Sequence, residues 1–147
     1  MSEQQIPTQL AEIRDDFLEM ELRDRLQLLL EFANELPELP ERYRDHPDLF
    51  ERVEECQSPV YIFIEVEDDT VQMYATAPAE APTTRGFASI LVQGLSGLSS
   101  QEVLELSEDY PQSLGLAQAV SPLRLRGMTG MLARAKRQIR LKTAAER

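Results

Sequence analysis

The sequence predicts an α+β fold, in which helices pack around a small antiparallel sheet. Apolar residues recur at helical spacing through the first third of the chain, over residues 8–36. The period changes to two short runs of β-branched and aromatic residues within residues 60–77, and helical spacing returns from residue 85 onward. Helices, a hairpin and further helices, in that order, are typical of an α+β fold. Because the chain has 147 residues, we expect one domain over residues 1–147.

Two helices are expected near the N-terminus. The run TQLAEIRDDFLEM, residues 8–20, has apolar residues at helical spacing and predicts a short helix. The leucine-rich run that follows, residues 20–36, predicts a longer one. Pro37 and Pro40 end it, because proline lacks a backbone N–H and its ring clashes with the preceding turn.

A loop and a hairpin follow. Residues 36–55 are interpreted as a loop, with a helical turn near residues 41–44. The runs VYIFIEVE, residues 60–67, and VQMYATA, residues 71–77, are rich in β-branched and aromatic residues. They are separated by the short polar segment 68–70, so the pattern predicts two antiparallel strands joined by a tight turn.

The second half returns to helices. Small residues and prolines in residues 77–84 indicate a loop, and the apolar run that follows, residues 85–98, predicts a buried helix. Residues 99–106 predict a short helix. Ser99 stands three residues before Glu102, which is the spacing of a capping box.

The last predicted helix, residues 121–142, is basic. Ser121 is its expected N-cap and Pro122 its first helical residue. Residues 121–147 contain eight Lys and Arg and one Glu, a net charge of +7, which leaves −18 for residues 1–120 of the total of −11. A basic helix could contact nucleic acid. We expect instead that its charge is solvated or lies against the acidic body, which would repel phosphates, so no nucleic-acid partner is predicted.

Cysteine usage and the N-terminus indicate a reducing compartment. Cys56 is the only cysteine, so no disulfide can form within the chain. The first residues lack the basic start and apolar run of a secretory signal, and no apolar run is long enough to span a bilayer. We expect a soluble, cytoplasmic protein with no membrane partner.

Few residues can carry chemistry. Cys56 and His46 are too few for a metal site and lack motif spacing, so no metal is expected. The sequence has no glycine-rich phosphate loop and no nucleophile-elbow serine. A protease-type pair of Cys56 with His46 is disfavoured because this His lies in an irregular loop. The polar neighbours Glu54, Glu55 and Gln57 predict that the Cys56 loop reaches solvent, which leaves the thiol open to a reactive role or to that of a small buried residue.

Several motifs together resemble one family. The stretch CQSPVYIFIEVEDDTVQMYATAPAEAPTTRGFASIL, residues 56–91, resembles the core of the SufE family, the sulfur-acceptor proteins of iron–sulfur cluster assembly. In that family a Cys-Gln-Ser triplet opens a hairpin, and Arg-Gly or Lys-Gly starts the next helix. Upstream, LLEFANELPELPER is similar to the family's helix and Leu-Pro-x-Leu-Pro loop, and downstream AVSPLRLRGMTGML resembles its Ser-Pro-x-Arg-x-x-Gly-Met element. The resemblance implies a fold like that of iron–sulfur scaffolds of the IscU type.

The resemblance assigns roles to individual positions. Cys56 matches the persulfide-forming cysteine of the family. The positions that it assigns to support of the sulfur site or to partner binding are Gln57, Ser58, Glu80, Arg85, Gly86 and Arg124. The chain departs from the family pattern at Glu55, where Gly is usual, at Ala79, where Ser is usual, and at Leu123 and Arg126, which replace small or amide residues.

The resemblance implies a carrier that acts with an enzyme. Such a protein takes persulfide sulfur onto Cys56 from a pyridoxal-phosphate-dependent cysteine desulfurase of the SufS type, stimulates that enzyme, and delivers the sulfur to an iron–sulfur scaffold of the SufBCD type. The pyridoxal phosphate belongs to the partner, so no cofactor is expected here. One thiol suffices for transfer, whereas a cluster scaffold needs several. The alternative is an adaptor that binds the desulfurase without accepting sulfur, which Glu55 favours, and a homodimer is left open.

The surroundings of the thiol can also be predicted. Carboxylates raise the pKa of a nearby thiol and guanidinium groups lower it. We therefore predict that Arg124, and secondarily Arg85, approach Cys56 and offset Glu54 and Glu55. The resemblance further implies that the thiol is buried in the unbound protein and that its loop opens on the desulfurase.

Overall fold

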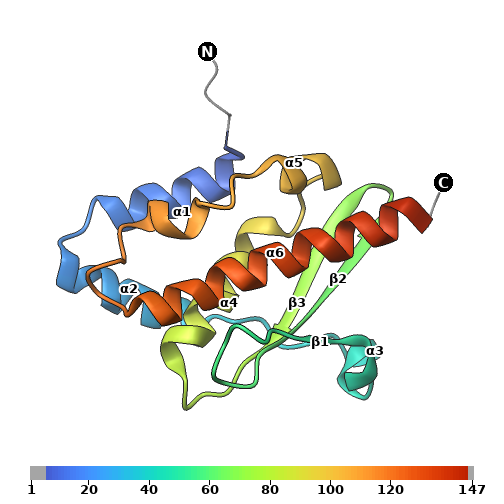
Figure 1. Ribbon diagram of the computed structural model, residues 1–147, viewed down its shortest axis with the longest axis horizontal. Helices are drawn as coiled ribbons and strands as arrows, with labels where there is room; N and C mark the ends of the chain where they lie inside the picture. The colour runs from blue at the N-terminus through green and yellow to red at the C-terminus, as the bar shows by residue number, and fades with distance from the viewer. Residues whose placement is uncertain (1–5, 146–147) are drawn as a thin grey trace.

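The computed structural model describes residues 6–145 and confirms the predicted α+β architecture (Figure 1). Helices surround a small sheet, and one long helix crosses the molecule in front of it. The helices and strands are α1 (Thr8–Leu18), α2 (Leu22–Asn34), α3 (Glu41–Arg44), β1 (Glu51–Arg52), β2 (Tyr61–Glu67), β3 (Thr70–Thr76), α4 (Pro82–Leu95), α5 (Ser100–Glu105) and α6 (Pro122–Ala145), with short 3-10 turns at Pro47–Leu49 and Tyr110–Leu114.

The sheet is antiparallel, with the strand order β1-β2-β3. Strands β2 and β3 form the predicted hairpin, in which Glu67 lies opposite Thr70 at the turn. Asp68 and Asp69 make this turn with φ values of 52° and 63°. Aspartate tolerates the left-handed region better than most residues, and a turn with two positive φ values matches the twist of a hairpin.

Strand β1 corrects the sequence-based interpretation. Residues 36–55 were expected to form a loop, but Glu51 pairs with Ile62 and Arg52 pairs with Tyr61. Two residues are too few to show the alternation that identifies a strand. This short strand fixes the start of the loop that carries the cysteine.

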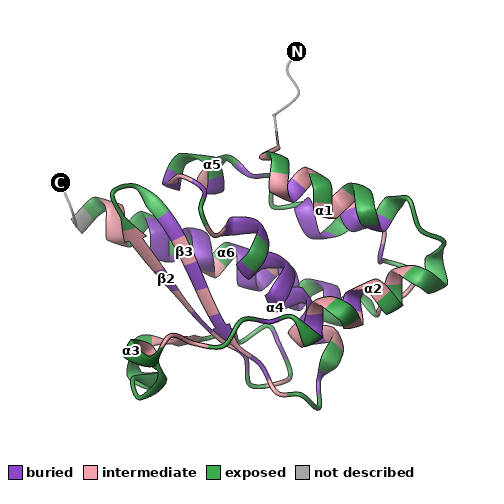
Figure 2. Cartoon of the chain, turned by 180° about the vertical axis from the view of Figure 1, so that it is seen from behind, coloured by how far each residue is buried: buried purple, intermediate pink, exposed green. Residues whose placement is uncertain are grey.

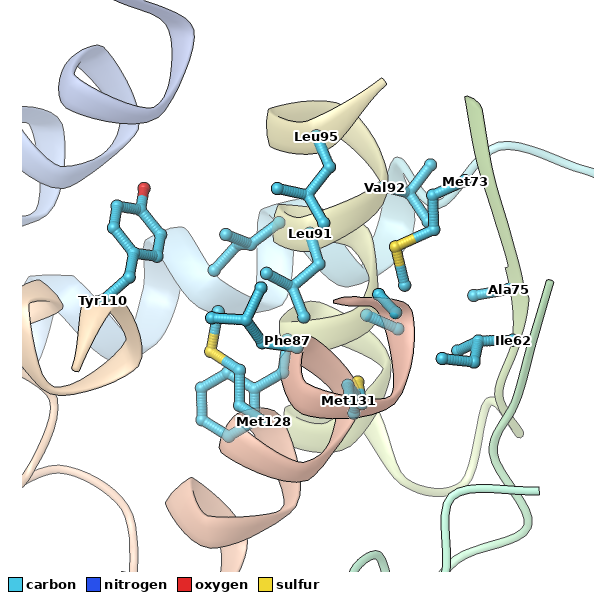
Figure 3. Close-up of a cluster of buried hydrophobic side chains, with 14 of the residues drawn as sticks. Ile62, Met73, Ala75, Phe87, Leu91, Val92, Leu95, Tyr110, Met128 and Met131 are labelled. Carbon is cyan, nitrogen blue, oxygen red and sulfur yellow. The ribbon is translucent and has the colours of Figure 1, made fainter. Parts of the chain in front are cut away.

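The core lies between one face of the hairpin and the helices α4 and α6. Helix α4 runs through its centre and is buried around most of its circumference (Figure 2). Figure 3 shows the clustered side chains, which are Phe87, Leu91, Val92 and Leu95 of α4, Met128 and Met131 of α6, Ile62, Met73 and Ala75 of the hairpin, and Tyr110. Because α6 packs on β2 and α4 packs on β3, the two helices are held in a fixed relation to the hairpin.

Two helix starts follow local chemistry. Helix α4 begins at Pro82 and ends at Leu95, whereas the apolar run predicted residues 85–98. The earlier start has a physical reason, because proline is well suited to the first turn of a helix. The predicted capping box of α5 is confirmed, since the N–H of Glu102 donates to Ser99 Oγ at 3.1 Å and the Glu102 carboxylate accepts from the Ser99 N–H at 2.9 Å.

Two lysines of helix α6 contact the rest of the protein. Its predicted N-cap is confirmed, because the N–H of Arg124 donates to Ser121 Oγ at 3.2 Å. The ammonium group of Lys136 donates to the carbonyl oxygen of Leu106, and that of Lys142 donates to a carbonyl oxygen of β2. These two ammonium groups are therefore paired within the protein, whereas Arg126 and Arg140 are exposed, so the basic face is partly packed against the body and partly solvated. Within residues 6–145, no helix has both the length and the apolar character needed to cross a bilayer.

Candidate functional site

Cys56 lies in the loop that joins β1 to β2. The loop is closed by its own backbone, since the N–H of Val53 donates to the carbonyl of Val60 at 2.9 Å and the N–H of Cys56 donates to the carbonyl of Val53 at 3.1 Å. Glu55 and Gln57 are exposed, but Cys56 itself is only 7% exposed. The loop therefore reaches solvent as predicted, while its thiol is turned into the protein.

Two glycines of α6 make room for this loop. A Cβ at Gly127 would lie 3.0 Å from the Sγ of Cys56, and a Cβ at Gly130 would lie 2.6 Å from Oε1 of Glu55. The sequence-based reasoning missed both roles. A signal exists, because each glycine inside a helix costs about 1 kcal/mol relative to alanine, and two of them one turn apart indicate a close approach.

Arg134 of α6 joins the cysteine loop to β1 through ion pairs. Its Nε lies 2.8 Å from Glu55 Oε1 and its Nη1 lies 2.7 Å from Glu51 Oε2. Glu51 also accepts from Arg137 and, at 3.0 Å, from Gln138. The hydrogen bond from Arg134 lowers the pKa of Glu55. Partial burial acts to raise the pKa of Glu51, but its three hydrogen-bond donors outweigh burial and lower it.

The thiol is held in its protonated form. Burial, followed by the charge of Glu55, raises the pKa of Cys56 to about 11, and Arg134 acts in the opposite direction. We predicted that Arg124 and Arg85 lower the pKa of the thiol, but the cation that lowers it is Arg134. A protonated thiol is a poor nucleophile, so this conformation represents an unreactive state.

A pocket of about 40 Å³ adjoins the thiol. It is lined by Glu55, Cys56, Gln57, Ser58, Thr84, Leu123, Arg124 and Gly127. This volume exceeds what one water-sized group requires. The arrangement can therefore accommodate an additional atom bonded to Sγ.

The comparison with protein families assigns the chain. A sequence profile of the SufE family, described as an Fe-S metabolism associated domain, matches residues 11–139. The chain belongs to the SufE family. This membership confirms the resemblance carried by the Cys-Gln-Ser triplet and its companion motifs, and it associates the protein with iron–sulfur metabolism.

Individual SufE-like proteins align over most of their length. The chain is 51% identical over 136 residues to an uncharacterized SufE-like protein of Mycobacterium tuberculosis. This alignment covers 92% of this chain and 94% of that protein. It is 30% identical over 128 residues to an uncharacterized SufE-like protein of Synechocystis, in an alignment that covers 86% of this chain and 77% of that protein. The solution structure of a hypothetical protein from Thermus thermophilus superposes with a TM-score of 0.83 at 35% identity and covers 95% of this chain and 99% of that one.

The structure brings together only part of the set that the SufE resemblance assigned. Gln57, Ser58 and Arg124 line the pocket beside Cys56. Glu80 is exposed and is not part of the pocket lining. The loop triplet and the start of α6 thus form the site.

Arg85 and Gly86 make structural contacts between α2 and α4. Arg85 donates from Nε to the carbonyl of Ala33 at 2.9 Å and from Nη1 to the carbonyl of Ala77 at 2.7 Å, which ties the end of α2 to the segment that enters α4. A Cβ at Gly86 would lie 2.5 Å from the carbonyl oxygen of Leu29, so this glycine lets α4 approach α2. Neither residue lines the Cys56 pocket.

The remaining candidate residue lies apart from the pocket lining. His46 is exposed, and its Nδ1 lies 4.0 Å from a carboxylate oxygen of Asp48. Over the described part of the chain, residues 6–145, no three His, Cys, Asp or Glu side chains are grouped as a metal ion would require. In the candidate site, the groups available for chemistry are the Cys56 thiol and its charged neighbours.

Proposed function

We propose that Cys56 accepts persulfide sulfur from a pyridoxal-phosphate-dependent cysteine desulfurase and that the protein delivers this sulfur to an iron–sulfur scaffold of the SufBCD type. The observation that carries the proposal is a lone thiol, 7% exposed, beside a pocket of about 40 Å³ that has room for one more atom. The association of the SufE family with iron–sulfur metabolism also supports this proposal. Stimulation of the desulfurase would follow from removal of its persulfide.

The transfer is a displacement at sulfur. Cys56 loses its proton, and its thiolate attacks the outer sulfur of a persulfide on the desulfurase. The sulfur–sulfur bond of the donor breaks, and the electron pair leaves with the cysteine thiolate of the enzyme. Cys56 then carries one additional sulfur atom, with no change in the total number of electrons. The pyridoxal phosphate of the partner supplies the chemistry that produces the first persulfide.

Transfer requires the loop to open, because the closed loop keeps the thiol buried and protonated. Exposure of Sγ to water would remove the main cause of the raised pKa of Cys56 and increase the thiolate fraction. Return of the loop would place the outer sulfur in the pocket, away from other thiols. A reducing compartment such as the cytoplasm would keep the thiol free for the next cycle.

A second candidate is an adaptor that binds a desulfurase and changes its activity without accepting sulfur. The raised pKa of Cys56 and the negative charge of the neighbouring Glu55 favour this interpretation, because both reduce the nucleophilicity of the thiol. The two candidates differ in what becomes of Cys56 when the desulfurase turns over.

Mass spectrometry of the intact protein tests the proposal. The protein is mixed with a SufS-type desulfurase and cysteine and is weighed without reductant. The wild type should gain one sulfur atom and Cys56→Ser should gain none. The double variant Cys56→Ser/Gln57→Cys, which moves the thiol to an exposed neighbouring position, serves as a control for the position of the thiol. No gain on the wild type, while the desulfurase is bound and active, would favour the adaptor.

A further inference from the structure

We infer that Arg134 is a positioning residue that holds the Cys56 loop closed through Glu55, so that the sulfur donor must separate this ion pair before transfer. The inference rests on the proposed function of Cys56. It names a residue that lies outside the pocket lining and that the sequence motifs do not identify.

The geometry of the pair suits a latch. Two nitrogen atoms of Arg134, Nε and Nη2, face the two carboxylate oxygens of Glu55 at 2.8 and 3.4 Å, and a third, Nη1, contacts Glu51 on β1. Glu55 is the residue bonded directly to Cys56. The loop therefore cannot carry Sγ outward by any large distance without pulling the Glu55 carboxylate away from the guanidinium group.

The helix is shaped to receive this carboxylate. Gly130 lies one turn before Arg134 on α6, and its missing side chain leaves the space that Glu55 occupies, since a Cβ there would lie 2.6 Å from Oε1. The side chain of Arg134 is 24% exposed and that of Glu55 is 37% exposed. Because the ion pair is partly buried, salt screens it less than it screens an exposed pair. Hydrogen bonds to both oxygens of the carboxylate also make the pair stronger than a hydrogen bond to one oxygen would.

Two roles of Arg134 predict opposite effects on the thiol. As a nearby cation, Arg134 stabilises the thiolate, so its removal would slow the reaction of Cys56 with an alkylating reagent. As a latch, it limits how often the loop opens, so its removal would accelerate the same reaction. The sign of the change therefore distinguishes a latch from a simple electrostatic neighbour.

The experiment measures the rate of Cys56 alkylation by iodoacetamide over a range of pH in the full chain. Arg134→Gln should accelerate the reaction by about fivefold, the factor that corresponds to an ion pair of about 1 kcal/mol. Glu54→Gln removes an exposed charge from the same loop, and Arg137→Gln removes an arginine that pairs with Glu51 but not with Glu55. Neither control should accelerate alkylation comparably.

A second variant covers the case in which Arg134→Gln does not fold. Arg134→Lys keeps the positive charge but cannot contact both carboxylate oxygens in the same planar geometry, so a latch predicts faster alkylation and a cation alone predicts no change. Slower or unchanged alkylation in the folded variants would overturn the inference. Because no desulfurase is present in this assay, the latch can fail while sulfur transfer to Cys56 is still observed by mass spectrometry, and the reverse result is equally distinguishable.

Discussion

The backbone of α6 at Gly127 leaves the space that the Sγ of Cys56 fills, at a separation where an added Cβ would lie only 3.0 Å from the sulfur. The position of the thiol is thus set by the absence of a side chain on a neighbouring helix. This contact joins residues that are far apart in the sequence, and it determines how deeply the sulfur is buried.

Gly127→Ala should displace the thiol without unfolding the protein. The added methyl group is too close to Sγ for ordinary van der Waals contact, so the side chain of Cys56 must shift outward. We expect faster alkylation of Cys56, while the gain in helix propensity of about 1 kcal/mol offsets part of the steric cost. Alkylation rates and thermal unfolding measure the two effects. Ala133→Gly, at an exposed position of the same helix, reports propensity alone, and an alkylation rate identical to the wild type would contradict the assigned contact.

Cys56 should titrate well above an ordinary thiol, whose pKa is about 8.5. The thiolate absorbance of wild type minus that of Cys56→Ser should rise with a midpoint near pH 11. Because the folded pKa is the higher one, stabilisation by the neutral thiol is complete below the unfolded pKa and is lost as the pH rises toward about 11. Over this window the free energy of unfolding should fall more steeply for the wild type than for Cys56→Ser. A midpoint near the ordinary value would mean that the thiol is exposed in solution.

Arg124→Ala should weaken the encounter with the desulfurase and leave the thiol titration unchanged. The residue is exposed and lines the pocket, but the guanidinium group that acts on the Cys56 pKa belongs to Arg134. Charges at the rim of an interface mainly affect association, so we expect the half-saturating concentration of this protein in a desulfurase assay to rise about fivefold. Arg126→Ala is the matched control, since Arg126 is exposed on the same helix and does not line the pocket. Equal effects of both variants would remove the case for a specific role of Arg124.

Gly86→Ala should destabilise the fold rather than the site. Its Cβ would meet a backbone atom, the carbonyl oxygen of Leu29, at 2.5 Å, so α4 and α2 must move apart. We expect a loss of about 1–3 kcal/mol in the free energy of unfolding, measured by chemical denaturation. Gly94→Ala in the same helix meets the end of the Leu10 side chain and should cost less. Loss of sulfur transfer in Gly86→Ala at unchanged stability would instead assign this glycine a direct role.

Much of the fold follows from local sequence patterns. The hairpin, the capping box at Ser99 and the N-cap at Ser121 depend on neighbouring residues, and the structure contains all three. The two residues of β1 gain their conformation from pairing with β2, so no local pattern identifies them. Tertiary pairing of this kind lies outside what a single sequence segment can indicate.

The site was harder to predict than the fold because its energetics depend on contacts between distant segments. The cysteine triplet is visible as a motif, but Arg134 approaches Glu55 only because α6 packs across the β1–β2 loop. Within the basic segment, no sequence feature separates this arginine from those that remain exposed, such as Arg126 and Arg140. The arginines predicted to lower the pKa of the thiol were Arg124 and Arg85, whereas the one that does so is Arg134, which reaches the loop only through tertiary packing.

The burial of Cys56 also affects how fast air oxidises the protein. Joining two copies by a disulfide removes two electrons, which dissolved oxygen accepts, and each sulfur can react only while its own loop is open. A variant whose loop opens more often should therefore form the disulfide-linked dimer faster at the same protein concentration. The rate at which the reduced protein forms this dimer in air thus measures how often the loop opens.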